Sequence, residues 1–191
     1  MSFEKERFTP EEATKHVHSP RLAGLMAEYF KGSSRPLYDF GCGTGYYLSR
    51  IASNGVMRRC TGLEGTEFIK KKDYIHIMHP VDIVSRIHLG PKGDVISIEV
   101  GEHIAEDRLN GFLWNLNHHC DKRLVLTWAV RGQGGTRHVS CRDEHEVLDM
   151  IEPFGFEYKK DLSEAWREKA GKDLWWFKKS IYIFEREDKD E

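Results

Sequence analysis

Long apolar runs are missing from this sequence of 191 residues. No stretch approaches the roughly 20 consecutive apolar residues that a membrane-spanning helix needs. The first residues, MSFEKERFTPEE, also lack the apolar core of a signal peptide. We therefore expect a cytoplasmic protein without a membrane partner.

Cysteine is scarce, and neither sign of charge is in large excess. Cys42, Cys60, Cys120 and Cys141 include no Cys-x-x-Cys pair, which argues against a disulfide framework or a structural zinc site. The net charge of −2 gives no electrostatic reason to bind nucleic acid, although a local basic patch would be compatible with it. The chain length suits one domain that spans residues 1–191.

Strand and helix patterns alternate along the chain. The pattern predicts a strand and its helix within about 36–53, further strands at 57–63, 74–78, 94–100, 122–130 and 174–184, helices at about 20–31, 67–72, 144–152 and 162–170, and an amphipathic helix that contains Ile104 and Leu116. Such alternation is typical of an α/β fold, in which helices cover both faces of a mostly parallel sheet.

The sequence LYDFGCGTGYYL at residues 37–48 predicts a buried strand, a tight turn and a helix. Glycines at 41, 43 and 45 let a ligand lie against the main chain, near the free N–H groups of the helix. Glu64, at the end of the next strand, can accept hydrogen bonds from both hydroxyls of a ribose. A nucleoside with a polar tail is therefore expected, although a dinucleotide or a plain connecting turn also fits. The dinucleotide fingerprint, however, is Gly-x-Gly-x-x-Gly, and position 46 is Tyr.

The segment from Asp39 to Gly45 resembles the first motif of class I S-adenosylmethionine-dependent methyltransferases, and Glu64 matches their acidic residue at the second strand. The resemblance implies a Rossmann-like seven-stranded sheet, with 174–184 as an antiparallel strand between the fifth and sixth. It also implies that Asp39 steers the amino-acid part of the cofactor and that Asp82 lies near its adenine. The full predicted cofactor site is Asp39, Phe40, Gly41, Cys42, Gly43, Glu64, Gly65, Asp82, Ile83 and Glu99.

Glu99, Glu102 and His103 follow the fourth strand at spacings i, i+3 and i+4, which would bring them together on one turn of helix. Two carboxylates and an imidazole can bind a divalent ion, with His138 as a fourth ligand. The pattern resembles the metal-binding Glu-x-x-Glu-His of ubiquinone-pathway O-methyltransferases and small-RNA 2′-O-methyltransferases. Glu102, His103 and His138 are accordingly the candidate catalytic residues. Alternatively, Glu99 contacts cofactor or substrate, His103 acts as a base without metal, or Glu102 and His103 only cap a helix.

Two aromatic or histidine-rich clusters have competing interpretations. Trp175, Trp176 and Phe177 form either a wall of the acceptor pocket or part of the core. His118 and His119 end a predicted helix, where histidine complements the helix dipole, and a metal site there is not expected.

The leading hypothesis is an O-methyltransferase that acts on a small molecule, a sugar or a chain end. The sequence has no Asp-Pro-Pro-Tyr and no Pro-Cys, which argues against the nucleobase methyltransferases that carry these motifs. The short chain also leaves no separate domain for recognising a folded macromolecule. A nicotinamide-dependent oxidoreductase and a non-catalytic S-adenosylmethionine-binding protein are the alternatives. The acceptor and the oligomeric state stay open.

Overall fold

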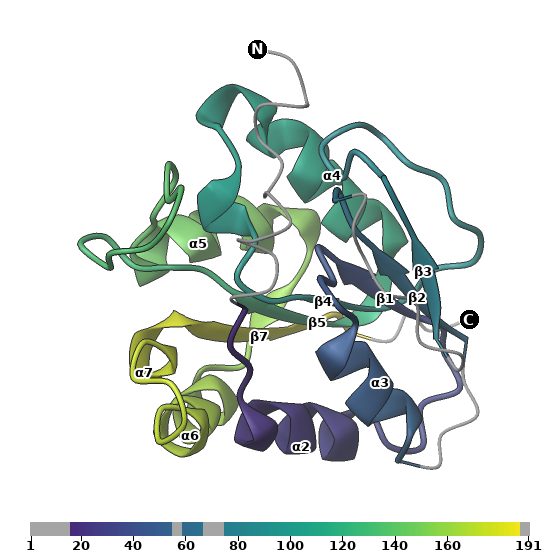
Figure 1. Ribbon diagram of the computed structural model, residues 1–191, viewed down its shortest axis with the longest axis horizontal. Helices are drawn as coiled ribbons and strands as arrows, with labels where there is room; N and C mark the ends of the chain where they lie inside the picture. Colours follow the sequence, from purple (N-terminus) through teal and green to yellow (C-terminus); the bar gives the residue numbers. More distant parts are fainter. Residues whose placement is uncertain (1–15, 55–58, 67–74, 188–191) are drawn as a thin grey trace.

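A computed structural model describes residues 16–54, 59–66 and 75–187, which include a seven-stranded sheet (Figure 1). Its strands are β1 (Leu37–Phe40), β2 (Cys60–Leu63), β3 (His76–Met78), β4 (Gly93–Ser97), β5 (Cys120–Thr127), β6 (Glu157–Tyr158) and β7 (Ile181–Glu185). They are arranged in the order β3-β2-β1-β4-β5-β7-β6, and β7 runs antiparallel to both neighbours. The mostly parallel sheet and the inserted antiparallel strand are confirmed.

Helices cover both faces of the sheet. The helices α2 (Pro20–Tyr29), α3 (Tyr46–Ala52), α6 (Lys160–Ala170) and α7 (Phe177–Ser180) pack on one face, and α4 (Leu109–His119) and α5 (Glu144–Ile151) pack on the other (Figure 1). Short 3-10 turns lie at Gly101–His103, Glu106–Arg108 and Glu152–Phe154. The predicted helix at 67–72 falls outside the described residues.

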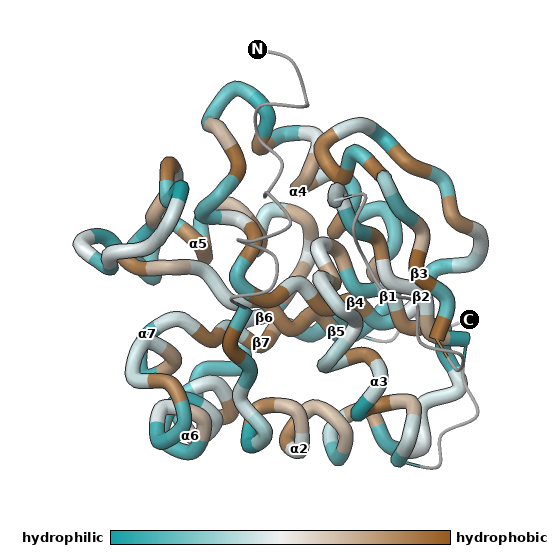
Figure 2. Tube along the Cα trace, in the orientation of Figure 1, coloured by the Kyte–Doolittle hydropathy of each residue, from teal (hydrophilic) through white to brown (hydrophobic). Residues whose placement is uncertain are grey.

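Central strands are buried on both faces, which explains their nearly continuous apolar sequence. Leu37 packs into the core under α2 and α3, whereas its neighbour Tyr38 packs into the core under α4 and α5. Ile183 and Phe184 in β7 alternate in the same way. Figure 2 shows hydrophobic residues concentrated along these strands.

Two strand boundaries differ from the prediction. β4 ends at Ser97, and Glu99 has a left-handed φ of 58°, so residues 99–103 do not form the expected continuous helical turn. The chain from Leu174 forms turns and then α7, with Phe177 N–H donating to Leu174 O (3.0 Å), so β7 begins only at Ile181. In both segments, turn hydrogen bonds or contacts with other elements override the local apolar pattern.

The start of α2 fixes the segment that precedes it. Ser19 Oγ accepts a hydrogen bond from Leu22 N–H (3.0 Å), and Pro20 lies in the first turn, as predicted. Ser19 Oγ also donates to Asp173 (2.7 Å), and Ser19 N–H donates to the hydroxyl of Tyr47 (3.1 Å). Residues 16–18 are thereby held beside the glycine turn. Among the described residues, no helix is long and apolar enough to span a membrane.

Candidate active site

A cavity of about 400 Å³ lies where the carboxyl ends of β1, β2 and β4 meet. Its wall contains nine of the ten residues predicted to bind the cofactor: Asp39, Gly41, Cys42, Gly43, Glu64, Gly65, Asp82, Ile83 and Glu99. Phe40 is the exception. Its side chain is fully buried in the core on the α4 side, because successive residues of a strand point to opposite faces.

The glycine turn is required by close packing. Gly41 has a φ of 80°, and a Cβ atom there would lie 2.4 Å from Cγ2 of Val100. The N–H groups of Gly41 and Cys42 donate to Leu63 O at 2.8 and 3.0 Å, which fixes the turn against the end of β2. Main chain therefore forms this wall of the cavity.

Acidic side chains surround the turn. The carboxylate of Glu64 accepts hydrogen bonds from Gly43 N–H (2.8 Å) and Thr66 N–H (2.9 Å), one on each oxygen. A second lone pair on each oxygen can still accept a ligand hydroxyl. Burial, and then the nearby Glu64, raise the pKa of Asp39 well above its usual value. A ligand with positive charge would relieve this repulsion.

Asp82 lies in the cavity wall, as predicted, and nearby residues hold its carboxylate in place. Its carboxylate accepts hydrogen bonds from Arg108 (2.9 Å), the hydroxyl of Ser85 (2.9 Å) and Val84 N–H (3.3 Å). Most of its accepting capacity is therefore used within the protein.

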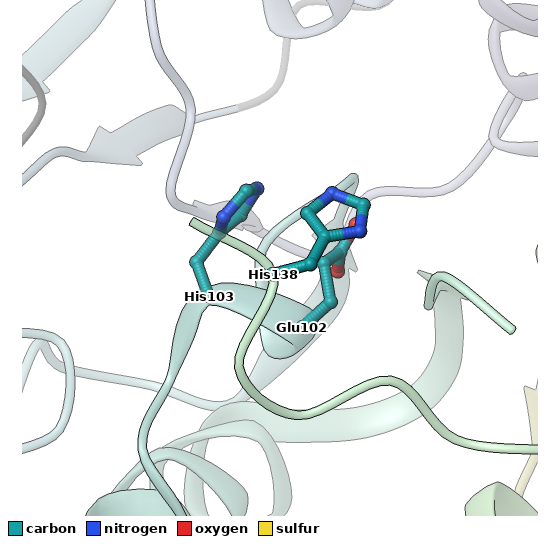
Figure 3. A group of neighbouring side chains, drawn as sticks. All are labelled: Glu102, His103 and His138. Carbon is teal, nitrogen blue, oxygen red and sulfur yellow. The ribbon is translucent and has the colours of Figure 1, made fainter. Parts of the chain in front are cut away.

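Glu102, His103 and His138 come together beside the cavity (Figure 3). The two histidines line the cavity, whereas Glu102 is not part of its wall. One potential ligand atom from each lies within 4.8 Å of the other two. Glu102 is fully buried, and its carboxylate oxygens make no hydrogen bond of good geometry among the described residues, although the N–H groups of Glu102 and Ala129 partly stabilise its charge. Burial and then the nearby charge of Glu99 raise its pKa well above the usual value.

Burial favours the neutral form of both histidines in this group. Burial lowers the pKa of His103 to about 4, with a further contribution from His138, and burial also lowers the pKa of His138. Neutral imidazoles can bind a metal or accept a proton. The buried carboxylate and two neutral imidazoles therefore fit a divalent cation.

Backbone hydrogen bonds bring His138 to a residue 36 positions earlier in the chain. Val139 and Ser140 donate their N–H groups to Glu102 O at 2.8 and 3.0 Å, and the indole of Trp128 donates to Ser140 O at 2.6 Å. The ring of His138 lies directly over Gly135, where a Cβ atom would come within 2.2 Å of its Nε2. The loop after β5 is thus fixed to the end of β4.

Glu99 lies outside this group. Its N–H donates to the hydroxyl of Thr127 (2.6 Å), and that hydroxyl donates back to Oε1 of Glu99 (2.8 Å). The prediction that residues 99, 102 and 103 share one helical turn is therefore wrong in geometry. Three of the four predicted metal ligands are brought together.

No family profile matches the sequence, and no curated protein matches it. Solved structures do resemble the fold. A sugar N-methyltransferase from Streptoalloteichus sp ATCC 53650 has a TM-score of 0.64 at 13% identity, over 92% of this chain and 90% of that one. A bacterial Hen1 methyltransferase domain has a TM-score of 0.62 at 15% identity, over 87% and 97% of the two chains.

The magnesium protoporphyrin IX methyltransferase of Synechocystis PCC 6803, solved with bound SAH, has a TM-score of 0.58 at 17% identity over 86% of this chain and 82% of that one. The chain has the class I methyltransferase fold. The seven-stranded sheet and the antiparallel β7 between β5 and β6 are those that the sequence resemblance implied.

Sequence reasoning did not anticipate several cavity residues of this methyltransferase fold. His16 and His18 line the cavity from the segment before α2, and the ring of His18 stacks on Tyr46 at 4.3 Å. No periodic pattern marks this segment, so only its tertiary contacts identify it.

Trp176 lines the cavity, whereas Phe177 lies in the core and Trp175 is exposed. Both interpretations of this aromatic cluster therefore apply, to different residues.

Proposed function

We propose that this protein is an S-adenosylmethionine-dependent methyltransferase that transfers the methyl group to a hydroxyl oxygen. The observation that carries the proposal is a cavity whose wall contains the glycine turn, Glu64, His103 and His138. The glycine turn and Glu64 suit a nucleoside cofactor, and the two histidines suit an acceptor that must lose a proton.

Acidic groups bind the cofactor in this proposal. The carboxylate of Glu64 holds the ribose hydroxyls through its remaining lone pairs, while Gly41 and Gly43 leave room for the cofactor against the main chain. The buried carboxylate of Asp39 favours the positive charge of the sulfonium and ammonium groups.

In this proposal His103 and His138 line the cavity and, together with the neighbouring buried Glu102, hold the acceptor in line with the methyl group at about 3–3.5 Å. They also fit a divalent metal ion, which would lower the pKa of the acceptor hydroxyl and orient it. The lowered pKa values of the two imidazoles favour their neutral forms, which can bind a metal.

The size of the cavity supports an acceptor whose reacting end alone enters it. A volume of about 400 Å³ lies near the lower end of the usual range for ligand sites, roughly 300–1,000 Å³. The cofactor would occupy most of this space. A small molecule, a sugar or a chain end fits such a site. The similar structures include a sugar N-methyltransferase, so this fold accommodates acceptors of that size.

Binding and turnover test the proposal. We expect calorimetry to detect binding of S-adenosylmethionine but not of NAD⁺. The substitution Glu64→Ala should weaken the binding of S-adenosylmethionine at least tenfold, which is about 1.4 kcal/mol. Glu168→Ala, at an exposed position on α6, is the control and should bind normally. A screen of hydroxyl acceptors should then release S-adenosylhomocysteine, and a divalent ion should increase the rate.

Other results would favour the alternatives. Binding of NAD⁺ instead of S-adenosylmethionine would indicate an oxidoreductase. Binding of S-adenosylmethionine without turnover of any hydroxyl acceptor, together with Glu102→Gln and His103→Ala proteins that retain their cellular role, would indicate a non-catalytic binding protein.

A further inference from the structure

Glu99 belongs to both predicted sets, the cofactor site and the metal site, and its surroundings favour one of them. Its side chain lines the cavity, while its main chain has a left-handed φ of 58°. Such a conformation is uncommon for a residue other than glycine, and it tends to persist only where surrounding contacts maintain it. Those contacts indicate what the carboxylate is held for.

Thr127 maintains the position of Glu99 at both ends of the residue. Its hydroxyl is fully buried, accepts the hydrogen bond from Glu99 N–H at 2.6 Å and donates its own proton to Oε1 at 2.8 Å. A hydroxyl has one proton to donate, so the pair forms a closed reciprocal arrangement. Oε1 therefore faces Thr127 on β5, and the indole of Trp176, which also lines the cavity, further stabilises the charge of the carboxylate.

Glu99 lies near residues of both groups, since its charge raises the pKa of Glu102 and its side chain also lines the cavity next to the cofactor residues. Its charge acts on the phenol of Tyr47, at the start of α3, as does the charge of Asp39. Both carboxylates line the cavity beside the glycine turn, where the amino-acid tail of the cofactor would lie. A primary ammonium group has three donors and needs several acceptors around it.

The metal group is complete without Glu99. Glu102, His103 and His138 already place three ligand atoms within 4.8 Å of one another. Catalytic metal sites characteristically use three protein ligands, two histidines and a glutamate among the known sets, and keep a further position open for a reacting oxygen. Three protein ligands leave the remaining positions of the ion open for the acceptor oxygen and for water.

We propose that Glu99 binds the ammonium group of the cofactor's amino-acid tail, and that Thr127 is its positioning residue. The divalent ion is then held by Glu102, His103 and His138 alone. This assignment rests on the proposed function, since it requires a cofactor with an amino-acid tail. It assigns the carboxylate of Glu99 to the cofactor and the carboxylate of Glu102 to the metal.

Calorimetric titrations with three probes test this assignment. The probes are S-adenosylmethionine, 5′-methylthioadenosine, which lacks the amino-acid tail, and MnCl₂. Burial raises the pKa of Glu99 to about 7, so the titrations are done at pH 8, where its carboxylate is ionised. We expect Glu99→Gln and Thr127→Val to lower the affinity for S-adenosylmethionine at least tenfold. The affinities for 5′-methylthioadenosine and for Mn²⁺ should change less than threefold.

Glu102→Gln is the reciprocal variant. It should lower the affinity for Mn²⁺ at least tenfold and change the affinity for S-adenosylmethionine less than threefold. Thr127→Ser keeps the hydroxyl and should restore the affinity for S-adenosylmethionine, which a role of Thr127 in packing alone would not explain. Circular dichroism of each variant checks that it is folded.

Each remaining result decides against the inference or against a named part of the proposed function. Loss of Mn²⁺ binding in Glu99→Gln would overturn the three-ligand assignment. Unchanged S-adenosylmethionine affinity in that variant would overturn the role in tail binding. If the wild-type protein binds S-adenosylmethionine but no Mn²⁺, the metal part of the function fails, while the comparison of the two nucleosides still decides the role of Glu99. If it binds no S-adenosylmethionine, both proposals fail.

Discussion

The buried side chain of Glu102 lowers the stability of the fold. A fully buried carboxylate without a hydrogen bond of good geometry among the described residues is unfavourable, because burial removes its hydration. The main chain around it is well satisfied, since Glu102 O accepts hydrogen bonds from both Val139 and Ser140. The side chain is thus held unsatisfied by an otherwise ordered turn, as expected of a group that waits for a cation or a substrate.

Glu102→Gln should stabilise the metal-free protein at pH 8. Because the folded-state pKa of Glu102 is raised, its contribution to stability is fully present below the unfolded value near 4.5 and is lost as the pH rises through the folded value. Glutamine does not titrate. We expect a gain of about 1–3 kcal/mol at pH 8, or roughly 2–4 °C in Tm per kcal/mol.

Thermal unfolding in the presence of a chelator, at pH 5 and pH 8, measures this effect. The advantage of the glutamine variant should shrink at pH 5, where the wild-type carboxyl is protonated. Glu168→Gln, on the exposed face of α6, should change Tm by less than about 2 °C at either pH, because surface substitutions usually change stability by no more than about 0.5 kcal/mol. A variant that is less stable than the wild type at pH 8 would show that Glu102 has a stabilising partner.

Among the elements, the turn between β1 and α3 connects the fold to the cavity most directly. Gly41, Gly43 and Gly45 all have positive φ angles, of 80°, 52° and 70°. The left-handed backbone turns the chain sharply from the buried strand into the helix, and the main chain is exposed to the cavity at this bend. At Gly41, any side chain would be strained by the left-handed backbone and would also collide with Val100.

Gly41→Ala should weaken cofactor binding at least tenfold and lower stability by about 1–3 kcal/mol. The left-handed backbone and the contact of 2.4 Å with Val100 both act against the added methyl group. Calorimetry with S-adenosylmethionine and chemical unfolding measure the two effects.

Gly32→Ala is the matched control for this substitution. Gly32 also has a positive φ, 77°, but a Cβ atom there meets nothing within 4 Å, and the residue lies after α2, outside the cavity lining. It should cost about 1–2 kcal/mol of stability without changing cofactor affinity. Equal loss of affinity in both variants would show that instability, and not the turn, weakens binding.

At the scale of the whole molecule, the cavity joins segments that are far apart in the chain. Residues 16–18, the ends of β1, β2 and β4, the loop after β5 and Trp176 all line it. Both cores pack against the same sheet, so loss of the sheet would remove the binding site and the two cores together. We therefore expect the chain to unfold as one cooperative unit.

S-adenosylhomocysteine should shift this single transition as a whole. At a ligand concentration of 100 times Kd, the gain is about 2.7 kcal/mol, which corresponds to a rise in Tm of roughly 5–10 °C. Far-ultraviolet circular dichroism and tryptophan fluorescence should report the same midpoint with and without ligand. Two separate midpoints, of which only one moves with the ligand, would contradict a single domain.

The sequence alone determined the features that depend on short-range patterns. Continuous apolar stretches predicted the strands, the alternation of strands and helices predicted a mostly parallel sheet, and the glycines at 41, 43 and 45 predicted the turn. In such a sheet the chain must place the turn after β1 and Glu64 after β2 at the same edge. The binding of S-adenosylmethionine and of a metal stays a prediction, because it depends on groups that the chain itself does not contain.

Only the tertiary structure decided which groups meet in the cavity. The direction of Glu99 depends on the hydroxyl of Thr127, 28 residues later, and the place of His138 depends on hydrogen bonds from its loop to Glu102. The segment at 16–18 and Trp176 also reach the cavity through contacts between parts of the chain that are far apart in sequence. Sequence spacing predicts contacts within one regular element, whereas these positions are set where elements end, by hydrogen bonds and packing between segments far apart in the chain.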